Sequence, residues 1–307
     1  MNVCLMLVGI SGSGKSTYSD YLRRVGFEVF SSDKIRMELW GDENDQRNPS
    51  EVFNTLHRRI LSALKEGKNC VYDATNISAK KRAAFIRMVK GSNINCEFAC
   101  RVFVTTPKEC IERDKKRDRT VGANVIWKQI KHFEIPSYSE GWDEINLFVT
   151  GKEHLDLDVI VDTFSGTLYD EHDNPHHSLT ISEHMSKAAE YILNNTGRGE
   201  QSIAYIAAKY HDIGKYFTKT NVDRLGNITE DSHFYGHHNV GSYLFLCSTC
   251  AKALEKDNCI LNIAFLIQHH MDHYIRNKDS LDKFYKENDF SLIRELHFVE
   301  KADKEAH

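Results

Sequence analysis

The chain has 307 residues, of which 41% are hydrophobic and 27% are charged, and this length allows two domains with separate cores. No run of 18 or more apolar residues occurs, so a membrane-spanning helix is not expected. The short apolar start does not read as a signal peptide, because it runs straight into a glycine-rich segment. The eight cysteines have irregular spacing, which favours reduced thiols and a cytoplasmic protein.

The net charge of −4 conceals a difference between the two halves of the chain. Residues 1–155 hold 25 basic and 20 acidic side chains, whereas residues 156–307 hold 15 and 24, with 13 of the 16 histidines. A basic half suits a polyanionic substrate, and an acidic half rich in histidine suits bound divalent cations. The charge pattern therefore predicts two domains with different chemistry.

The segment GISGSGKS, residues 9–16, fits the phosphate-loop pattern G-x-x-x-x-G-K-[ST]. It lies between a continuous apolar run, typical of a buried strand, and an amphipathic helix that begins at Thr17. Lys15 is expected at the β- and γ-phosphates of ATP or another nucleoside triphosphate, and the Ser16 hydroxyl is expected to bind Mg²⁺. The residues predicted to bind the nucleotide are Gly9, Ser11, Gly12, Ser13, Gly14, Lys15, Ser16 and Thr17.

The rest of the first half alternates between strand-like and helix-like segments, which predicts a parallel α/β sheet covered by helices. The second half is mainly helical, apart from one strand-like piece at 159–161. The domain boundary is expected between residues 158 and 159, with an α/β domain before it and an all-α domain after it. The expected strands are 27–30, 70–72, 100–104 and 145–149, and the expected helices are 52–64, 80–89, one opening at Pro107, 181–193, 203–210, 240–254, 260–268 and 290–303.

Two carboxylates follow strands of the predicted sheet. Asp33 comes after the second strand, where the ends of parallel strands open onto the ligand crevice. It could accept the proton of an attacking hydroxyl, or it could cap a helix that starts at Lys34. Asp73, in the run Asp73-Ala74-Thr75-Asn76, follows the third strand at the same edge, with Arg82 further along the chain.

A basic run follows the fourth strand. Arg113 and Arg117 are four residues apart and are expected to share a helix face, from which two guanidinium groups could close over the triphosphate and stabilise the transition state. The alternative is a solvated charged face that also carries Asp114 and Asp118.

Together these motifs resemble the phage-type 5′-polynucleotide kinases over most of residues 1–150. The resemblance rests on the phosphate loop, on Asp33 with Arg36, on the Asp73 run with Arg82, and on the Arg113/Arg117 pair. The segment 133–143 also resembles the end of that domain. The resemblance implies that Asp33 is the general base on a 5′-hydroxyl and that Arg36 holds the acceptor phosphate. It also implies that Arg113 and Arg117 contact the phosphates of the donor. Related small-molecule kinases keep similar arginines, so the acceptor stays open.

The second half contains a series of candidate metal ligands. Adjacent His211 and Asp212 can direct one nitrogen and one oxygen at a single cation. The other candidates are far apart in sequence, so only a helical bundle with inward-pointing ligands could bring them together. A divalent metal there would activate water and polarise a phosphoryl oxygen. These candidates are His177, His184, His237, His238, His269, His270 and Asp303.

This ordered series resembles the HD phosphohydrolase superfamily over residues 175–305. The resemblance implies that His211, Asp212 and Asp303 bind a metal together with His184, which fits the first position better than His177. It also implies that His237, with either His269 or His270, completes a second metal site or contacts the phosphate. Residues of these types accept Mn, Fe, Co, Ni or Zn, so the metal is not specified.

The sequence therefore predicts a two-domain enzyme that processes RNA or DNA ends. The first domain would phosphorylate a 5′-hydroxyl with ATP and Mg²⁺, and the second would hydrolyse a 3′-phosphate or a 2′,3′-cyclic phosphate, leaving ends that a ligase can join. One alternative is a nucleotide or small-molecule kinase fused to a nucleotide phosphohydrolase. Another is a non-catalytic sensor of ATP or nucleotide. No membrane partner is expected, and the oligomeric state is not specified.

Overall fold

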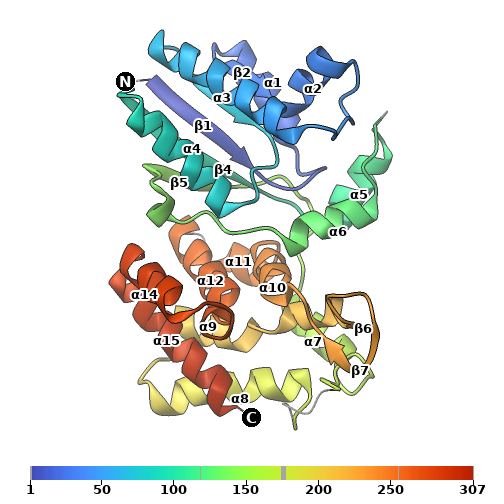
Figure 1. Ribbon diagram of the computed structural model, residues 1–307. Coiled ribbons are helices and arrows are strands. Elements are labelled where there is room, and N and C mark those ends of the chain that lie inside the picture. Colours follow the sequence, from blue (N-terminus) through green and yellow to red (C-terminus); the bar gives the residue numbers. More distant parts are fainter. Residues whose placement is uncertain (1, 118, 174–177, 255, 307) are drawn as a thin grey trace. The chain divides into compact units, whose positions relative to one another are not determined.

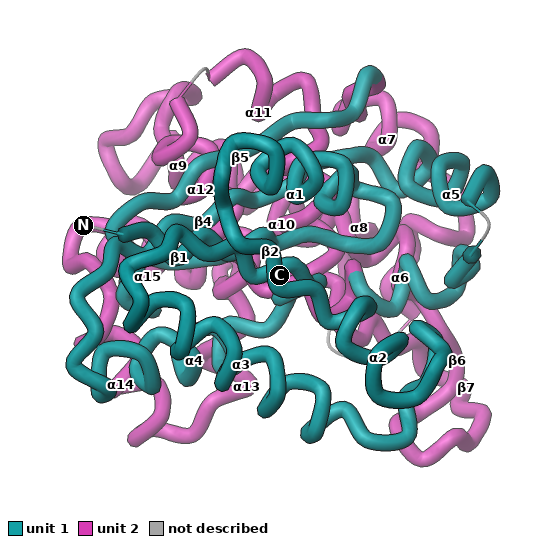
Figure 2. The backbone as a smooth tube through the Cα atoms, turned by 90° about the horizontal axis from the view of Figure 1, so that it is seen from above, with its two compact units in different colours: residues 1–129, 136–152 teal, residues 130–135, 153–307 magenta. Residues whose placement is uncertain are grey.

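The computed structural model describes residues 2–117, 119–173, 178–254 and 256–306 (Figure 1). The chain forms two compact units: residues 1–129 with 136–152, and residues 130–135 with 153–307 (Figure 2). The main part of the second unit starts at residue 153, whereas the predicted boundary lies between residues 158 and 159. Leu155 explains the earlier start, because its N–H donates to the carbonyl of Cys247 and its carbonyl accepts from Thr249. Among the described residues, no helix combines the length and the apolar character that crossing a membrane requires.

The first unit contains a five-stranded sheet in which the paired strands are all parallel, as predicted. Its order is β2-β3-β1-β4-β5. From β1 the chain crosses past β3 to β2, whereas from β3 it crosses past β1 to β4, so the direction of the crossovers reverses beside β1. At such a reversal open α/β sheets form their ligand crevice. The strands are β1 (Asn2–Val8), β2 (Glu28–Ser31), β3 (Cys70–Asp73), β4 (Cys96–Val104) and β5 (Glu144–Val149).

Helices cover both faces of this sheet. The first crossover runs in the opposite direction to the next two, so right-handed connections place its helix on one face and theirs on the other, as Figure 2 shows for α1 against α3 and α4. The core is apolar: Leu5, Leu7, Val71 and Phe103 are buried. The helices are α1 (Lys15–Arg24), α2 (Ser32–Trp40), α3 (Pro49–Lys65), α4 (Ala79–Gly91), α5 (Pro107–Lys115), α6 (Ala123–Lys131) and the 3₁₀ turn η1 (Tyr138–Glu140).

Arg82, which follows the Asp73 run in the chain, lies in the interior of the first unit. Its guanidinium donates to both carboxylate oxygens of Glu140, at 2.7 and 2.6 Å, and to the carbonyl of Asn76. Both side chains are almost fully buried, at 1% and 6% exposed. The pair ties α4 to η1, and Trp142 donates its indole N–H to the same carboxylate. Its role here is structural.

Replacing Glu140 by Gln should leave a buried guanidinium uncompensated. We expect the free energy of unfolding of the first unit to fall by about 3–5 kcal/mol, the usual loss when one partner of a buried pair is removed. The matched control is Glu38→Gln, because Glu38 makes an exposed pair with Arg59 and should cost less than about 1 kcal/mol. Urea denaturation followed by circular dichroism measures both. Equal losses in the two variants would contradict this account.

The second unit is helical, in agreement with the predicted class. Helices α8, α9, α10, α12 and α15 pack against one another around a core that includes Ile192, Tyr243 and Leu296. The helices are α7 (Leu157–Phe164), α8 (Ile181–Asn195), α9 (Ile203–Tyr210), the 3₁₀ helix η2 (Ile213–Phe217), α10 (His237–Leu246), α11 (Thr249–Ala253), α12 (Asp257–His269), α13 (Asp272–Ile275), α14 (Lys278–Glu287) and α15 (Phe290–Glu305), and one antiparallel hairpin joins β6 (Thr220–Val222) to β7 (Ile228–His233).

Two local predictions in this unit are wrong. The strand expected at 159–161 is part of α7, because the Asp156 carboxylate accepts the N–H groups of Asp158 and Val159 and starts a helix. The single helix expected at 240–254 is divided, because the Ser248 hydroxyl accepts the N–H of Ala251 and begins α11. In both places a local side-chain cap outweighs the propensity of the apolar run.

Residues 130–135 belong to the second unit although they precede the end of the first. The Gln268 side chain holds them: its amide nitrogen donates to the carbonyl of Phe133, and its oxygen accepts the N–H of Ile135. Asn239 likewise donates to the carbonyl of Lys131. The segment 133–143, which the sequence assigns to one domain end, is therefore divided between the units.

Candidate active sites

The phosphate loop joins β1 to α1 and depends on its glycines. Gly12 and Gly14 have φ of +81° and +97°, a conformation that favours glycine. A Cβ at Gly12 would also lie 2.4 Å from the carbonyl oxygen of Cys110. The loop is held by Gln129 of α6, whose oxygen accepts the N–H of Ser11 and whose nitrogen donates to the Ser11 hydroxyl. Gln129 is a supporting residue that the motif did not reveal.

Lys15 folds back over this loop. Its ammonium donates to the carbonyl of Ile10 at 2.7 Å and lies 3.4 Å from the Ser13 hydroxyl. Burial lowers the pKa of Lys15 to about 8, and the nearby Asp73 carboxylate only partly offsets the change. Ser16 and Thr17, by contrast, are exposed at the start of α1. A buried ammonium is stabilised by a negative partner, and a bound triphosphate would provide one, so the position of Lys15 fits a nucleotide site.

This pKa predicts that nucleotide binding takes up a proton. At pH 8 about half of the free Lys15 side chains lack their proton, whereas a bound triphosphate favours the charged form. We therefore expect an uptake of roughly 0.5 proton per MgATP at pH 8 and almost none at pH 6.5. Titration calorimetry in buffers of different ionisation enthalpy measures the uptake. An uptake that does not change between these two pH values would contradict the assignment to Lys15.

Asp73 lies at the end of β3, directly beside the phosphate loop. The Ser19 hydroxyl is 2.9 Å from an Asp73 carboxylate oxygen and 2.9 Å from the carbonyl of Ser16. Burial raises the pKa of Asp73, while Lys15 and Ser19 act in the opposite direction. A carboxylate close to the phosphate loop suits Mg²⁺, which prefers oxygen ligands. The first site therefore fits a nucleotide with Mg²⁺, Ser16 being its predicted protein ligand.

Asp33 lies in the first turn of α2 and is not the helix cap, which is Ser31. Its carboxylate accepts a hydrogen bond from Arg36 at 2.7 Å and pairs with Arg119 at 3.2 Å. The Arg36 side chain is 9% exposed, and its Nε has no hydrogen-bond partner among the described residues. The alternative in which Asp33 serves only as a cap is thus wrong, and its role as a base stays a prediction.

The two arginines of the predicted pair do not share a helix face, because α5 ends at Lys115 and Arg117 lies beyond it. Arg113 points toward the phosphate loop, where it donates to the carbonyls of Thr150 at 2.6 Å and Gly12 at 3.4 Å. Arg117 is exposed, but its charge lowers the pKa of Lys15, so it also lies near the loop. Asp114 is buried and accepts two backbone N–H groups, which excludes it from a solvated face. Asp118 lies outside the described residues.

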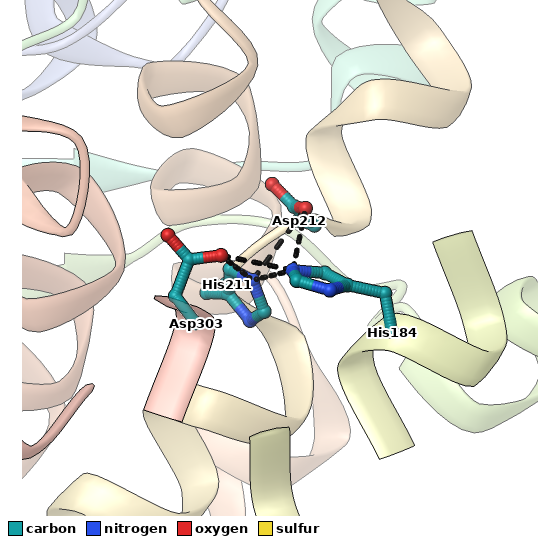
Figure 3. A group of neighbouring side chains, drawn as sticks. All are labelled: His184, His211, Asp212 and Asp303. Atoms are coloured by element: carbon teal, nitrogen blue, oxygen red, sulfur yellow. Dashed lines mark hydrogen bonds and ion pairs between the residues drawn. The ribbon is translucent and has the colours of Figure 1, made fainter. Parts of the chain in front are cut away.

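In the second unit, six helical segments bring six predicted ligands together in the interior. His184 lies on α8, His211 ends α9, Asp212 begins η2 and Asp303 lies on α15 (Figure 3). The Nε2 of His184 is 3.1 Å from that of His211 and 2.9 Å from an Asp303 oxygen. A second group shares Asp212, whose other oxygen is 3.3 Å from His237 and 3.6 Å from His270.

The ring orientations of these histidines indicate a cation. In each of the four the Nδ1 faces a backbone carbonyl, of Ala306, Ala208, Phe234 or Ile267. A carbonyl only accepts, so each Nδ1 carries a proton and each Nε2 points inward. The Nε2 atoms of His237 and His270 face each other at 3.3 Å. A shared cation brings such nitrogens together without repulsion, so the residues fit one or two divalent metals.

Asp212 is the centre of both groups. Burial alone would raise its pKa, but the adjacent Lys215 ammonium and His211 hold it well below its usual value. Lys215 is buried and lies 2.6 Å from Asp212 and 3.0 Å from the Nε2 of His172. His172 is also buried, and its pKa falls to about 4. Neither Lys215 nor His172 was assigned a role from the sequence, because their proximity arises only in the folded bundle.

The structure also separates the candidates that the sequence left open. His184 lies in the first group, whereas His177 lies outside the described residues. His270 lies in the second group, whereas the neighbouring His269 pairs with Asp272 at 2.8 Å. His238 belongs to neither group, and burial lowers its pKa to about 3.

Comparison with known proteins finds a family model that matches part of each half. Residues 4–136 match the AAA domain family, and residues 176–306 match the HD domain family. The chain is also 29% identical over 145 residues to the "Putative bifunctional polynucleotide kinase/RNA ligase" of Autographa californica nuclear polyhedrosis virus. This match covers 42% of the chain but only 20% of the relative, so the chain spans about a fifth of that protein's length.

Several solved structures also match part of the chain. The Pnkp1/Rnl/Hen1 RNA repair complex is 25% identical, with a TM-score of 0.38 and coverage of 43% of each chain. A fungal RNA kinase is 14% identical, with a TM-score of 0.37, and the match covers 55% of this chain and 45% of the other. A gluconokinase from Sinorhizobium meliloti is 15% identical, with a TM-score of 0.33 and coverage of 48% and 81%.

Proposed function

We propose that this chain, an enzyme that joins an AAA-type P-loop domain to an HD domain, repairs the ends of nucleic acids. The first domain would transfer the γ-phosphate of ATP to a 5′-hydroxyl. The second would hydrolyse a 3′-phosphate or a 2′,3′-cyclic phosphate. The curated relative is named for polynucleotide kinase and RNA ligase activities, which favours RNA as the substrate and a ligase as the partner that joins the products.

The kinase proposal is supported by three groups that face the crevice of the first unit. Lys15 and Arg113 lie at the phosphate loop, and Asp33 lies in the first turn of α2, directly after β2. When the hydroxyl oxygen bonds to the γ-phosphorus, the bond to the β-phosphate oxygen breaks, ADP leaves and Asp33 takes the hydroxyl proton. Lys15 and Arg113 would stabilise the charge that develops on the phosphoryl oxygens. Mg²⁺ would neutralise further charge on the same oxygens.

The observation that carries the hydrolase proposal is the set of inward-facing Nε2 atoms around Asp212. His184, His211, Asp212 and Asp303 would hold a divalent metal, and His237 and His270 would hold a second one with Asp212. Such a metal supplies Lewis-acid polarisation and an activated water, and the donor set suits Mn, Ni, Co, Fe or Zn. Lys215 adds a buried positive charge beside the same carboxylate, which favours an anionic substrate.

One oligonucleotide tests both halves. It carries a 5′-hydroxyl and a 3′-phosphate, in RNA and DNA versions, and it is incubated with γ-labelled ATP, Mg²⁺ and each candidate transition metal in turn. We expect label at the 5′ end and metal-dependent release of phosphate from the 3′ end. Labelling of small hydroxyl compounds but of neither oligonucleotide would contradict the kinase proposal. Release of phosphate from free nucleotides but not from the oligonucleotide would contradict the proposed hydrolase substrate.

A further inference from the structure

Arg119 connects two parts of the first unit that flank the proposed acceptor crevice. It follows α5 in the chain, yet its partners lie in α2 and in the loop 41–48. Its Nη1 is 3.2 Å from Asp33 and 3.0 Å from Glu43, and its Nε donates to the Asn44 side chain at 2.6 Å. No motif in the sequence assigns it a role.

These contacts occupy the carboxylate that the kinase proposal needs. One Asp33 oxygen accepts from Arg36, and the other faces Arg119. To take a proton from a hydroxyl, Asp33 must offer an oxygen within hydrogen-bond reach of it. The Asp33 oxygen that faces Arg119 must therefore either accept from both the guanidinium and the acceptor hydroxyl, or lose its contact with Arg119 when the acceptor binds.

The partners of Arg119 can be exchanged at low cost. The side chains of Arg119, Glu43 and Asp33 are 25%, 38% and 44% exposed, and ion pairs with this exposure contribute little to stability. A phosphodiester offers two oxygens to the fork of a guanidinium and can bind it with two hydrogen bonds, as a carboxylate does. An incoming phosphate can thus replace Glu43 and Asp33 as the partner of Arg119.

The position of Arg119 suits a phosphate next to the one held by Arg36. Both guanidiniums touch the same carboxylate, so they lie side by side across Asp33. Arg36 has an Nε without a partner among the described residues, which leaves a donor for the phosphate of the terminal nucleotide. Lys115, Lys116 and Arg117, in the chain just before Arg119, are exposed cations that would attract the following backbone.

Resting on the proposed kinase function, we infer that Arg119 binds the second phosphate of a polynucleotide acceptor. In the free enzyme the Arg119 guanidinium pairs with Glu43 and Asp33 in place of that phosphate. Binding of the acceptor transfers Arg119 to the phosphodiester and frees the outer oxygen of Asp33. Arg119 would then distinguish a polynucleotide from an acceptor with a single phosphate.

The decisive experiment compares two acceptors, a 5′-hydroxyl oligonucleotide and a nucleoside 3′-monophosphate. For Arg119→Ala we expect the KM of the oligonucleotide to rise about tenfold or more, with kcat changed less than about threefold, while the KM of the monophosphate stays that of the wild type. For Glu43→Gln, which removes a competitor, we expect the oligonucleotide KM to fall about two- to fivefold. The control Arg47→Ala removes an exposed cation of the same loop, paired with Asp45, and should change neither KM.

An equilibrium measurement gives a readout that does not depend on turnover. The salt dependence of oligonucleotide binding, measured by fluorescence anisotropy on the full chain, should lose a slope of about 0.7 in Arg119→Ala. Arg119→Lys keeps the charge, so most of the wild-type slope should remain. Its oligonucleotide KM should stay close to that of Arg119→Ala, because a lysine lacks the guanidinium fork.

Three results would overturn the inference. The first is an equal rise of KM for both acceptors, and the second is a fall in kcat for Arg119→Ala and Glu43→Gln alike, as a structural link would produce. The third is an Arg119→Ala variant whose oligonucleotide KM and salt slope equal those of a wild type that phosphorylates oligonucleotides. This result would contradict the inference about Arg119 but not the kinase function. A wild type that phosphorylates no oligonucleotide would overturn the kinase function itself.

Discussion

Asp212→Asn should abolish phosphohydrolase activity and most of the metal binding of the second unit. Asp212 is shared by both groups of candidate ligands, so its loss removes one anionic oxygen from each. An asparagine has nearly the same shape but no charge to offset a divalent cation. We expect phosphate release from a 3′-phosphorylated oligonucleotide to fall by about 10³-fold or more, the order of effect seen when a charge-stabilising group is lost from an active site.

Metal content and thermal melting, measured on the same preparations, separate the site effect from misfolding. The substitution also leaves the buried Lys215 without its carboxylate, so a lower melting temperature is expected together with the loss of metal. The matched control uses two adjacent histidines. His270→Ala should reduce the metal content, whereas His269→Ala should not, because His269 pairs with Asp272 outside the two groups. Full metal content in Asp212→Asn would refute the site.

Asp33→Ala should remove most of the 5′-kinase activity while leaving ATP binding nearly unchanged. A general base of this kind contributes about 10²–10⁴-fold to the rate, and we expect kcat to fall within that range. Lys15 and the phosphate loop do not depend on Asp33 for their contacts, so the KM of ATP should change little. Transfer of label to a 5′-hydroxyl oligonucleotide measures the loss.

The chain offers a close control for this substitution. Asp20 pairs with Arg23 at the same spacing, three residues apart on a helix, as Asp33 pairs with Arg36, but the Asp20 pair lies on the exposed face of α1. Asp20→Ala should therefore leave kcat within about twofold, since exposed pairs contribute little. If Asp33→Ala labelled the oligonucleotide as well as Asp20→Ala does, Asp33 would not be the base.

The parts that the sequence predicted correctly are those whose physical cause is local. The phosphate loop is contiguous, because a tight anion-binding turn needs its glycines, its lysine and its hydroxyl in succession. The alternation of strands and helices shows in the periodicity of apolar residues. His211 and Asp212 stand out because they are adjacent at a helix end. Each of these features can be recognised from a short stretch of consecutive residues.

Wrong predictions came from neglected side-chain contacts. Asp156 and Ser248 start helices where the apolar pattern suggested a strand and an unbroken helix. No role beyond the resemblance was assigned to Arg82 from the sequence, whereas the structure pairs it in the interior with Glu140, 58 positions later. Such a partner has no signature near the residue that it controls.

The sequence by itself determined that a phosphate-binding α/β half precedes a helical, histidine-rich half. Only the tertiary structure decided which residues lie together. It chose His270 over His269, made Asp212 common to both ligand groups, and placed Arg119 on the Asp33 carboxylate. The reason is physical: these relations depend on where distant helices and loops pack, and packing is a property of the whole core rather than of any segment.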